Sequence, residues 1–148
     1  MSGSLRVRPA SAADLPWARR LLAAADLPAE GLDDQFPAAF AVLEAEDRPV
    51  GLAGLERYGA SGLLRSVAVD AGVRGSGAGR LLVADRLERA RADGLAAVYL
   101  LTTTAADWFP RFGFRQIPRE ELPADLDSAP EVAGGCPATA TVMRVVLT

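Results

Sequence analysis

The sequence predicts a mixed α/β domain of three layers, in which a mostly antiparallel sheet of about seven strands carries helices on both faces. Runs of apolar and β-branched residues alternate with helical patterns, beginning with a strand and a helix. Tight-turn signals join successive strands near the middle of the chain, as in antiparallel sheets. The 148 residues, half of them hydrophobic, suit one domain with a substantial core, so a single domain over 1–148 is expected.

The N-terminal half is predicted to contain a strand, a helix and then three strands. Residues 5–8 alternate in polarity, which favours a strand. Residues 11–26 place apolar side chains three to four positions apart, with Pro16 near the first turn, which favours a helix. Residues 27–38 contain two prolines and a glycine and predict a loop with room for one short helix. Three strands follow at 39–47, 50–59 and 62–70, the first two joined by a turn at 47–49.

The C-terminal half is predicted to begin with the longest helix of the chain. This helix, at 77–94, has an apolar face, pairs Asp85 with Arg89 one turn later, and ends at Gly94. The remaining elements are a strand at 96–104, a short helix at 105–112, a strand at 113–117, an irregular stretch at 118–137 and a strand at 139–147.

Composition excludes several classes of protein. The net charge of -3 argues against a nucleic-acid-binding protein, which normally presents a basic face. No apolar run is long enough to span a membrane, and the N-terminus lacks the apolar core of a signal peptide. Cys136 is the single cysteine, so no internal disulfide can form, and a cytoplasmic location is expected.

Two residue types are missing from the sequence. There is no histidine, which excludes Ser-His-Asp and Cys-His catalysis and histidine metal sites, so we expect no metal. All 16 basic residues are arginine, so there is no lysine for a Schiff base or a P-loop. Acid–base chemistry must therefore come from Asp, Glu, Tyr, Cys, bound water or the substrate.

A glycine-rich segment, RGSGAG at 74–79, lies between a predicted strand and the long predicted helix. Backbone N–H groups at a helix N-terminus are unpaired, and glycines let a phosphate approach them closely. A P-loop would need a lysine, and a dinucleotide-binding fingerprint would need glycine where Arg80 stands. The segment therefore predicts a phosphate ligand of another kind, or else a turn that merely begins a helix.

Five segments follow one another along the chain in the order LLRSVAV, RGSGAG, GRLLVADRLERARADG, VYLLTT and WFPRFGF. Together they resemble the GNAT superfamily of N-acetyltransferases, over nearly the whole chain. The resemblance implies a three-layer fold whose sheet splays apart in the middle, with acetyl-CoA as co-substrate in the gap. It implies contacts to the donor from Val67, Ala68, Val69, Arg74, Gly75, Ser76, Gly77, Ala78, Gly79, Arg80 and Phe109.

Shorter motifs resemble two narrower groups. GLLRSVAV, YLLTTTA and CPATATVM resemble the small N-acetyltransferases of arsenic-resistance operons, and LLTTTAADWFPRFGF resembles the acetyltransferase domain of N-acetylglutamate synthases. Both resemblances imply a small anionic, amino-acid-like amine as the acceptor, either a glutamate-like organoarsenical or glutamate itself. A homodimer is a further expectation, because dimers are common among similar proteins.

The usual proton donor of the superfamily is absent from this sequence. Similar enzymes place a tyrosine where Phe109 stands, and phenylalanine cannot protonate the departing thiolate. The proton would come from Thr103 or Thr104, from water or from the amine. Because an alkyl thiol has a pKa of about 8.5, departure as thiolate is also feasible. A non-catalytic CoA-binding module is the alternative that this substitution leaves open.

Candidate acceptor-site residues come from four places in the sequence. Glu56 is the first choice of base, the alternative being a solvated residue paired with Arg57. Arg65 suits a substrate carboxylate, the alternative being an arginine on the wet face of a strand. We predict further contacts to the acceptor from Ser66, Arg119 and Cys136, and we expect Cys136 to line the pocket and not to act as a nucleophile.

Overall fold

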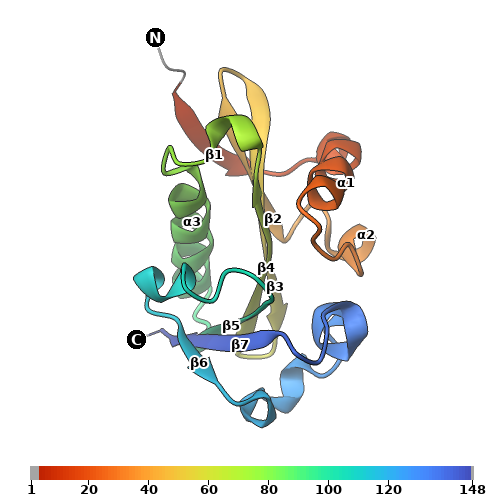
Figure 1. Cartoon of the computed structure of the whole chain (residues 1–148), viewed down its shortest axis with the longest axis vertical. Helices are drawn as coiled ribbons and strands as arrows, with labels where there is room; N and C mark the ends of the chain where they lie inside the picture. The colour runs from red at the N-terminus through yellow and green to blue at the C-terminus, as the bar shows by residue number, and fades with distance from the viewer. Residues whose placement is uncertain (1–3, 148) are drawn as a thin grey trace.

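A seven-stranded sheet forms the middle layer of the molecule, with the strand order β1-β2-β3-β4-β5-β7-β6 (Figure 1). The computed structural model describes residues 4–147. Its strands are β1 (Leu5–Pro9), β2 (Phe40–Ala45), β3 (Arg48–Tyr58), β4 (Ser61–Val69), β5 (Ala97–Thr102), β6 (Arg115–Ile117) and β7 (Thr141–Val146), and its helices are α1 (Leu15–Ala24), α2 (Leu32–Gln35) and α3 (Ala78–Ala92). The predicted three-layer α/β fold is confirmed.

Strands β4 and β5 are the only parallel neighbours in the described sheet, and they separate soon after they meet. Their pairing covers only Ser61–Leu63 against Ala97–Tyr99, whereas the other neighbouring strands pair in antiparallel fashion. Beyond Leu63 the two strands diverge and leave backbone and side chains of both facing a shared space. The predicted splay in the middle of the sheet is therefore present.

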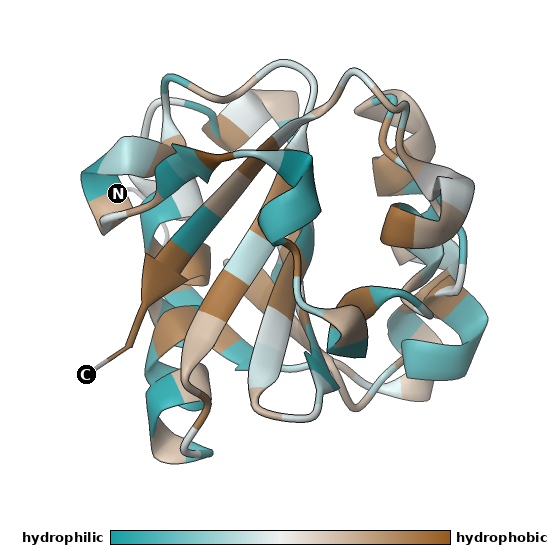
Figure 2. Cartoon of the chain, turned by 90° about the horizontal axis from the view of Figure 1, so that it is seen from below, coloured by the Kyte–Doolittle hydropathy of each residue, from teal (hydrophilic) through white to brown (hydrophobic). Residues whose placement is uncertain are grey.

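Helices cover both faces of the sheet. Figure 1 shows α3 on one side of the long strands and α1 and α2 on the other. Leu82, Val83 and Leu87 of α3 are buried against β2, β3 and β4, and Leu22 of α1 is buried with Phe40 on the opposite face. In Figure 2 hydrophobic residues recur along the central strands, whereas the peripheral helical turns mix hydrophilic and hydrophobic residues. Burial of these two apolar faces positions the sheet and its gap.

Strand β4 contains a bulge next to the gap. Gly54 pairs with Arg65 and Leu52 pairs with Ala68, so two residues of β4 stand opposite a single residue of β3. Ser66 lies in this bulge with a φ of 59°, a left-handed conformation that is uncommon for serine. A bulge leaves its extra residue outside the ladder and re-aims the neighbouring groups. Ser66 and the adjacent Val67 both line the space between β4 and β5.

The structure differs from the predicted element bounds at the turn between β2 and β3 and at the first helix, among other places. The turn between β2 and β3 lies at Glu46 and Asp47, both with positive φ, so Arg48 and Pro49 already belong to β3. A two-residue hairpin turn with left-handed geometry matches strand twist better than a longer turn. The first predicted helix begins instead as a separate turn at Ala12–Asp14, followed by α1.

The predicted pair of Asp85 with Arg89 in α3 is also wrong. Asp85 accepts a hydrogen bond from Arg86 at 2.8 Å, and Arg89 reaches Asp93 at 3.3 Å instead. Gly94, with a φ of 75°, follows the last helical turn as predicted. The arginine near the helix C-terminus therefore interacts with the acidic residue at its end.

The segment predicted to be irregular, 118–137, folds into short helical turns. They comprise Arg119–Glu121, Ala124–Leu126 and a wide turn at Glu131–Gly135. Leu126 and Ala129 are buried against β5 and β7, which anchors this segment beside the sheet. None of the described helices is long and apolar enough to cross a membrane.

Candidate active site

A cavity of about 480 Å³ lies where β4 and β5 separate. Its walls come from β4, β5, the loop before α3, the segment at 104–111 and the wide turn at 131–135. One end is bounded by the glycine loop and the other by Arg65, Glu131 and Cys136. A single cavity thus connects a backbone-rich end to a cluster of buried charged groups.

The glycine loop forms the first end of the cavity with almost bare backbone. Gly75 and Gly77 have φ values of 84° and 85°, and a Cβ atom on either would meet nothing within 4 Å. Glycine is therefore required at both positions by the left-handed backbone conformation and not by crowding. Gly77 caps α3 without any side-chain hydrogen bond from the described residues, so first-turn amides remain available to an anion.

Gly79 is a glycine for a different reason. A Cβ atom at this position would lie 3.2 Å from the Trp108 ring, closer than ordinary contact. The indole therefore packs directly on the first turn of α3. This contact ties the glycine loop to the segment that carries Phe109.

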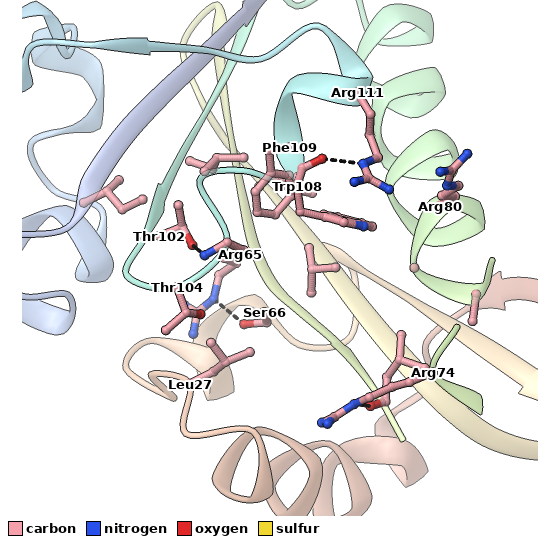
Figure 3. Close-up of a pocket in the computed structure, with 18 of the residues that line it drawn as sticks. Leu27, Arg65, Ser66, Arg74, Arg80, Thr102, Thr104, Trp108, Phe109 and Arg111 are labelled. Carbon is pink, nitrogen blue, oxygen red and sulfur yellow. Dashed lines mark hydrogen bonds between the residues drawn. The ribbon is translucent and has the colours of Figure 1, made fainter. Parts of the chain in front are cut away.

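Three arginines line the same end of the cavity: Arg74, Arg80 and Arg111 (Figure 3). Arg74 donates a hydrogen bond to the Val69 carbonyl at 3.3 Å, and Arg111 donates to the Trp108 carbonyl at 2.7 Å. Within residues 4–147 none of the three forms an ion pair with a carboxylate. In a chain of net charge -3, this gathering of unneutralised guanidinium groups favours an anionic ligand.

The predicted donor-site residues fall into two groups in the structure. Val67, Val69, Arg74, Gly75, Gly77, Ala78, Gly79, Arg80 and Phe109 line the cavity. Ala68 and Ser76 do not line it. The Ala68 side chain is buried in the cluster beneath α1, because alternate strand residues face opposite sides, and Ser76 donates its hydroxyl hydrogen to the Val73 carbonyl.

An ion pair between Glu56 and Arg65 lies at the second end of the cavity. Arg65 Nη1 is 3.0 Å from Glu56 Oε2, and neither side chain is exposed. The Tyr58 hydroxyl donates to the other Glu56 oxygen at 2.6 Å. Glu56 is not a solvated residue paired with Arg57, because it is buried and Arg57 pairs with Asp93. Arg65 is not on a wet face of its strand, because it is buried too.

The Arg65 guanidinium is almost fully used by the protein itself. It donates to the Glu30 carbonyl at 2.6 Å, to the Pro28 carbonyl at 3.1 Å and to Ser66 Oγ at 2.9 Å, besides Glu56. Of its five N–H groups, at most one remains for a substrate. Arg65 therefore fastens the loop before α2 to the sheet, and it is a weaker candidate for a carboxylate clamp than its sequence context suggests.

Two charged cavity residues, Arg111 and Glu131, were not singled out from the sequence, and Glu131 is the acidic one. It is 2% exposed, and its Oε2 lies 3.6 Å from Arg65 Nε. Burial, opposed by the nearby Arg65, raises the pKa of Glu131 to about 7. It follows Pro130 in a stretch without periodic pattern, so only its acidic character set it apart.

Cys136 lines the cavity beside Glu131 and is buried. Burial and the neighbouring carboxylate raise the pKa of the Cys136 thiol to about 12. The thiol is therefore neutral near pH 7 and unsuited to act as a nucleophile. This environment supports a lining role over an acetyl-enzyme route.

The remaining predicted residues lie at different distances from the cavity. Thr103 is exposed and does not line it, whereas Thr104 does. Arg119 also lies outside the lining: its Nη2 donates to the Val132 carbonyl at 3.4 Å, and Nη1 is buried without a partner among residues 4–147. Phe109 is buried in edge-to-face contact with Trp108 and Phe114, which fits a packing role.

Comparison with known families identifies the fold. The family model described as an acetyltransferase (GNAT) domain matches residues 37–116, more than half of the chain. The chain belongs to the GNAT acetyltransferase family. The predicted family is thereby confirmed, and the cavity of this GNAT domain is its candidate active site.

Curated relatives share part of the GNAT domain. An amino-acid acetyltransferase of Pseudomonas fluorescens is 40% identical over 88 residues, which are 57% of this chain and 20% of the relative. An amino-acid acetyltransferase of Neisseria meningitidis is 29% identical over 86 residues, again 57% of this chain and 20% of the relative. The aligned part of this chain thus spans about a fifth of each of these relatives.

Solved structures match over nearly the full length of this chain. N-acetylglutamate synthase of Neisseria gonorrhoeae, crystallised with coenzyme A and L-arginine, gives a TM-score of 0.82 at 23% identity and covers 98% of this chain and 34% of the synthase. Rv2747 of Mycobacterium tuberculosis, in complex with CoA and NLQ, gives a TM-score of 0.80 at 25% identity. The match covers 97% of this chain and 99% of Rv2747. These matches support the same three-layer architecture.

Proposed function

We propose that this domain transfers the acetyl group of acetyl-CoA to the amine of a small, amino-acid-like acceptor by direct attack. The main support for this proposal is that one cavity joins the glycine loop to the buried cluster around Glu131. The loop end suits the phosphates of the donor, and the cluster end suits an amine. Their connection through the gap between β4 and β5 suits a ternary complex.

The donor would lie along the bulged end of β4. Amides from Gly75 to Arg80 would hold the pyrophosphate, with Arg74 and Arg111 adding positive charge. The backbone of Val67 and Val69 would bind the pantetheine arm. The Val67 amide, beside the bulge at Ser66, would polarise the thioester oxygen. The thiolate would leave with a proton from the amine or from water, because Phe109 has none to give.

The acceptor class rests on the cavity and on the relatives. The far end is lined by Leu27, Pro28, Cys136 and the buried carboxylate of Glu131, which suits a small molecule with an amine. The curated relatives are amino-acid acetyltransferases, which supports an amino acid. Whether the acceptor is glutamate or an arsenic-containing analogue of it stays a prediction from sequence motifs.

A thiol-release assay tests the proposal. The protein is incubated with acetyl-CoA and, one at a time, the common L-amino acids and glutamate analogues, and free CoA thiol is measured. We expect one or more amines to raise release well above hydrolysis. Release that no amine accelerates, together with normal acetyl-CoA binding, would instead support a CoA-binding module.

That non-catalytic module is the second candidate, and Phe109 is the observation that favours it. The residue fills the usual tyrosine position and is packed between Trp108 and Phe114. Thermal shift separates binding from catalysis, since a ligand that binds only the native state raises the melting temperature. Acetyl-CoA that neither shifts melting nor releases thiol would contradict both candidates.

A further inference from the structure

We propose that Glu131 is the residue that receives the acceptor's proton, and that Glu56 is its structural counterpart. This inference rests on the proposed acetyl transfer. Two buried carboxylates flank one guanidinium, and the structure gives them different surroundings. The difference shows which of them is free to take a proton.

Glu56 is fully engaged inside the protein. One of its oxygens accepts from Arg65 at 3.0 Å and the other from Tyr58 at 2.6 Å. Its side chain has no exposed surface and does not line the cavity. A carboxylate with both oxygens occupied and no path to the cavity is poorly placed to take a proton from a ligand.

Glu131 has the opposite surroundings. It lines the cavity, and its contact with Arg65 Nε is 3.6 Å long, beyond a hydrogen bond. The Nε hydrogen is donated to Ser66 Oγ at 2.9 Å instead. The remaining partner of the Glu131 carboxylate is the neutral Cys136 thiol, which is a weak donor. Glu131 therefore keeps proton-accepting capacity on the side that faces a bound amine.

The charges around Glu131 come from several elements. Arg65 of β4 favours its ionised form, whereas Glu56 of β3 and Glu30 of the loop before α2 oppose it. Burial opposes it most, and the pKa is raised to about 7. Arg119 and Tyr58 lie farther out, next to Cys136 and Glu56 respectively. A base that titrates near neutral pH is well matched to an amine acceptor.

The step balances in protons and electrons. The acceptor binds as an ammonium ion, and ionised Glu131 removes one proton to give the neutral amine. The nitrogen lone pair attacks the thioester carbonyl carbon, the C–N bond forms and the C–S bond breaks with its electrons on sulfur. The second amine proton reaches the thiolate through water, and Glu131 returns its proton to solvent. The products are the amide, free CoA thiol and one proton.

The test uses Glu131→Gln, which preserves shape but cannot ionise, and Glu88→Gln as a control. Glu88 is an exposed carboxylate on α3 that lies 3.7 Å from Arg91, away from the described cavity. With the best amino acid from the panel, we expect the rate to rise through about pH 7 in the unchanged protein and in Glu88→Gln. In Glu131→Gln we expect a loss of about 10²–10⁴-fold at neutral pH and no such rise.

A second readout needs no acceptor. Infrared difference spectra recorded against pH should contain a carboxyl band that titrates near pH 7 and is missing from Glu131→Gln. A Glu131→Gln protein that binds acetyl-CoA but keeps the rate and pH profile of the unchanged protein would overturn the assignment, while acetyl transfer itself would stand. If no amine releases thiol even with the unchanged protein, the proposed function fails, and the infrared band alone decides whether Glu131 carries the exchangeable proton.

Discussion

The two ends of the cavity are built from different parts of the chain. The end proposed for the donor is a short continuous stretch, 74–80, made mainly of backbone with left-handed glycines at 75 and 77. The end proposed for the acceptor is made of side chains from β3, β4 and the wide turn at 131–135, together with backbone carbonyls of the loop before α2. Only the fold brings those four segments together.

This contrast shows how each end tolerates change. The donor end depends on the absence of side chains at two positions with positive φ and open space around them. The acceptor end depends on a closed arrangement of buried charges, in which removing one member leaves another unpaired. We therefore expect substitutions at the donor end to affect ligand affinity most, and substitutions at the acceptor end to affect stability and proton transfer most.

Arg65→Met should give the largest effect on stability. It leaves Glu56 and Glu131 as buried carboxylates without their guanidinium, so the free energy of unfolding in urea should fall by about 3–5 kcal/mol. Arg57→Met is the matched control, since Arg57 is 55% exposed in its pair with Asp93 and should cost at most about 1 kcal/mol. Equal losses in the two variants would show that the buried cluster has no special role.

Gly77→Val should break the donor end. Its φ of 85° and the open space around it mean that a valine strains the backbone and projects towards the bound pyrophosphate. We expect CoA affinity, measured by calorimetry, to fall by about 100-fold, or about 2.7 kcal/mol. Gly94→Val is the control, because Gly94 has a φ of 75° and similar open space but does not line the cavity. Equal loss of CoA affinity in both would contradict the loop assignment.

Glu131→Gln should change how stability depends on pH. Because the pKa is raised to about 7 in the folded protein, this residue stabilises the fold below the unfolded pKa, and that stability is lost as pH rises through 7. The glutamine variant lacks this loss. We expect its advantage in unfolding free energy to grow from near zero at about pH 4 to about 1–3 kcal/mol at about pH 8. Curves that stay parallel across this range would argue against a raised pKa.

Cys136→Ala should have the smallest effect on turnover. A thiol whose pKa is raised to about 12 stays protonated, so we expect thiol release with the best amine to change less than about tenfold. A variant that binds acetyl-CoA normally but releases no thiol would point to an acetyl-enzyme intermediate.

Local signals in the sequence were sufficient for the order of elements and for the glycine loop that precedes α3. Gly75 and Gly77 lie two positions apart in the sequence and both have positive φ, and Gly94 follows α3 as expected. The acceptor end was less accessible to prediction. Arg65 was expected to face a substrate or water, but its partners at Pro28 and Glu30 lie 37 and 35 residues away.

Glu131 was not predicted for the same reason. It lies in a stretch without periodic pattern, and its importance depends on its distance to Arg65 and on burial, which only the tertiary structure sets. The turn between β2 and β3 was predicted too late in the chain, at 47–49. The positive φ values of Glu46 and Asp47 were not expected, because neither residue is glycine.

Amide hydrogen exchange with and without CoA tests the central claim most directly, because it maps the donor site on the whole chain. We expect CoA to protect residues 66–80 and the segment at 104–111, and to leave the exposed C-terminal turn of α3 unchanged. Protection confined to surfaces outside the gap between β4 and β5, or no protection at saturating CoA, would contradict the assignment of this cavity as the acetyl-transfer site.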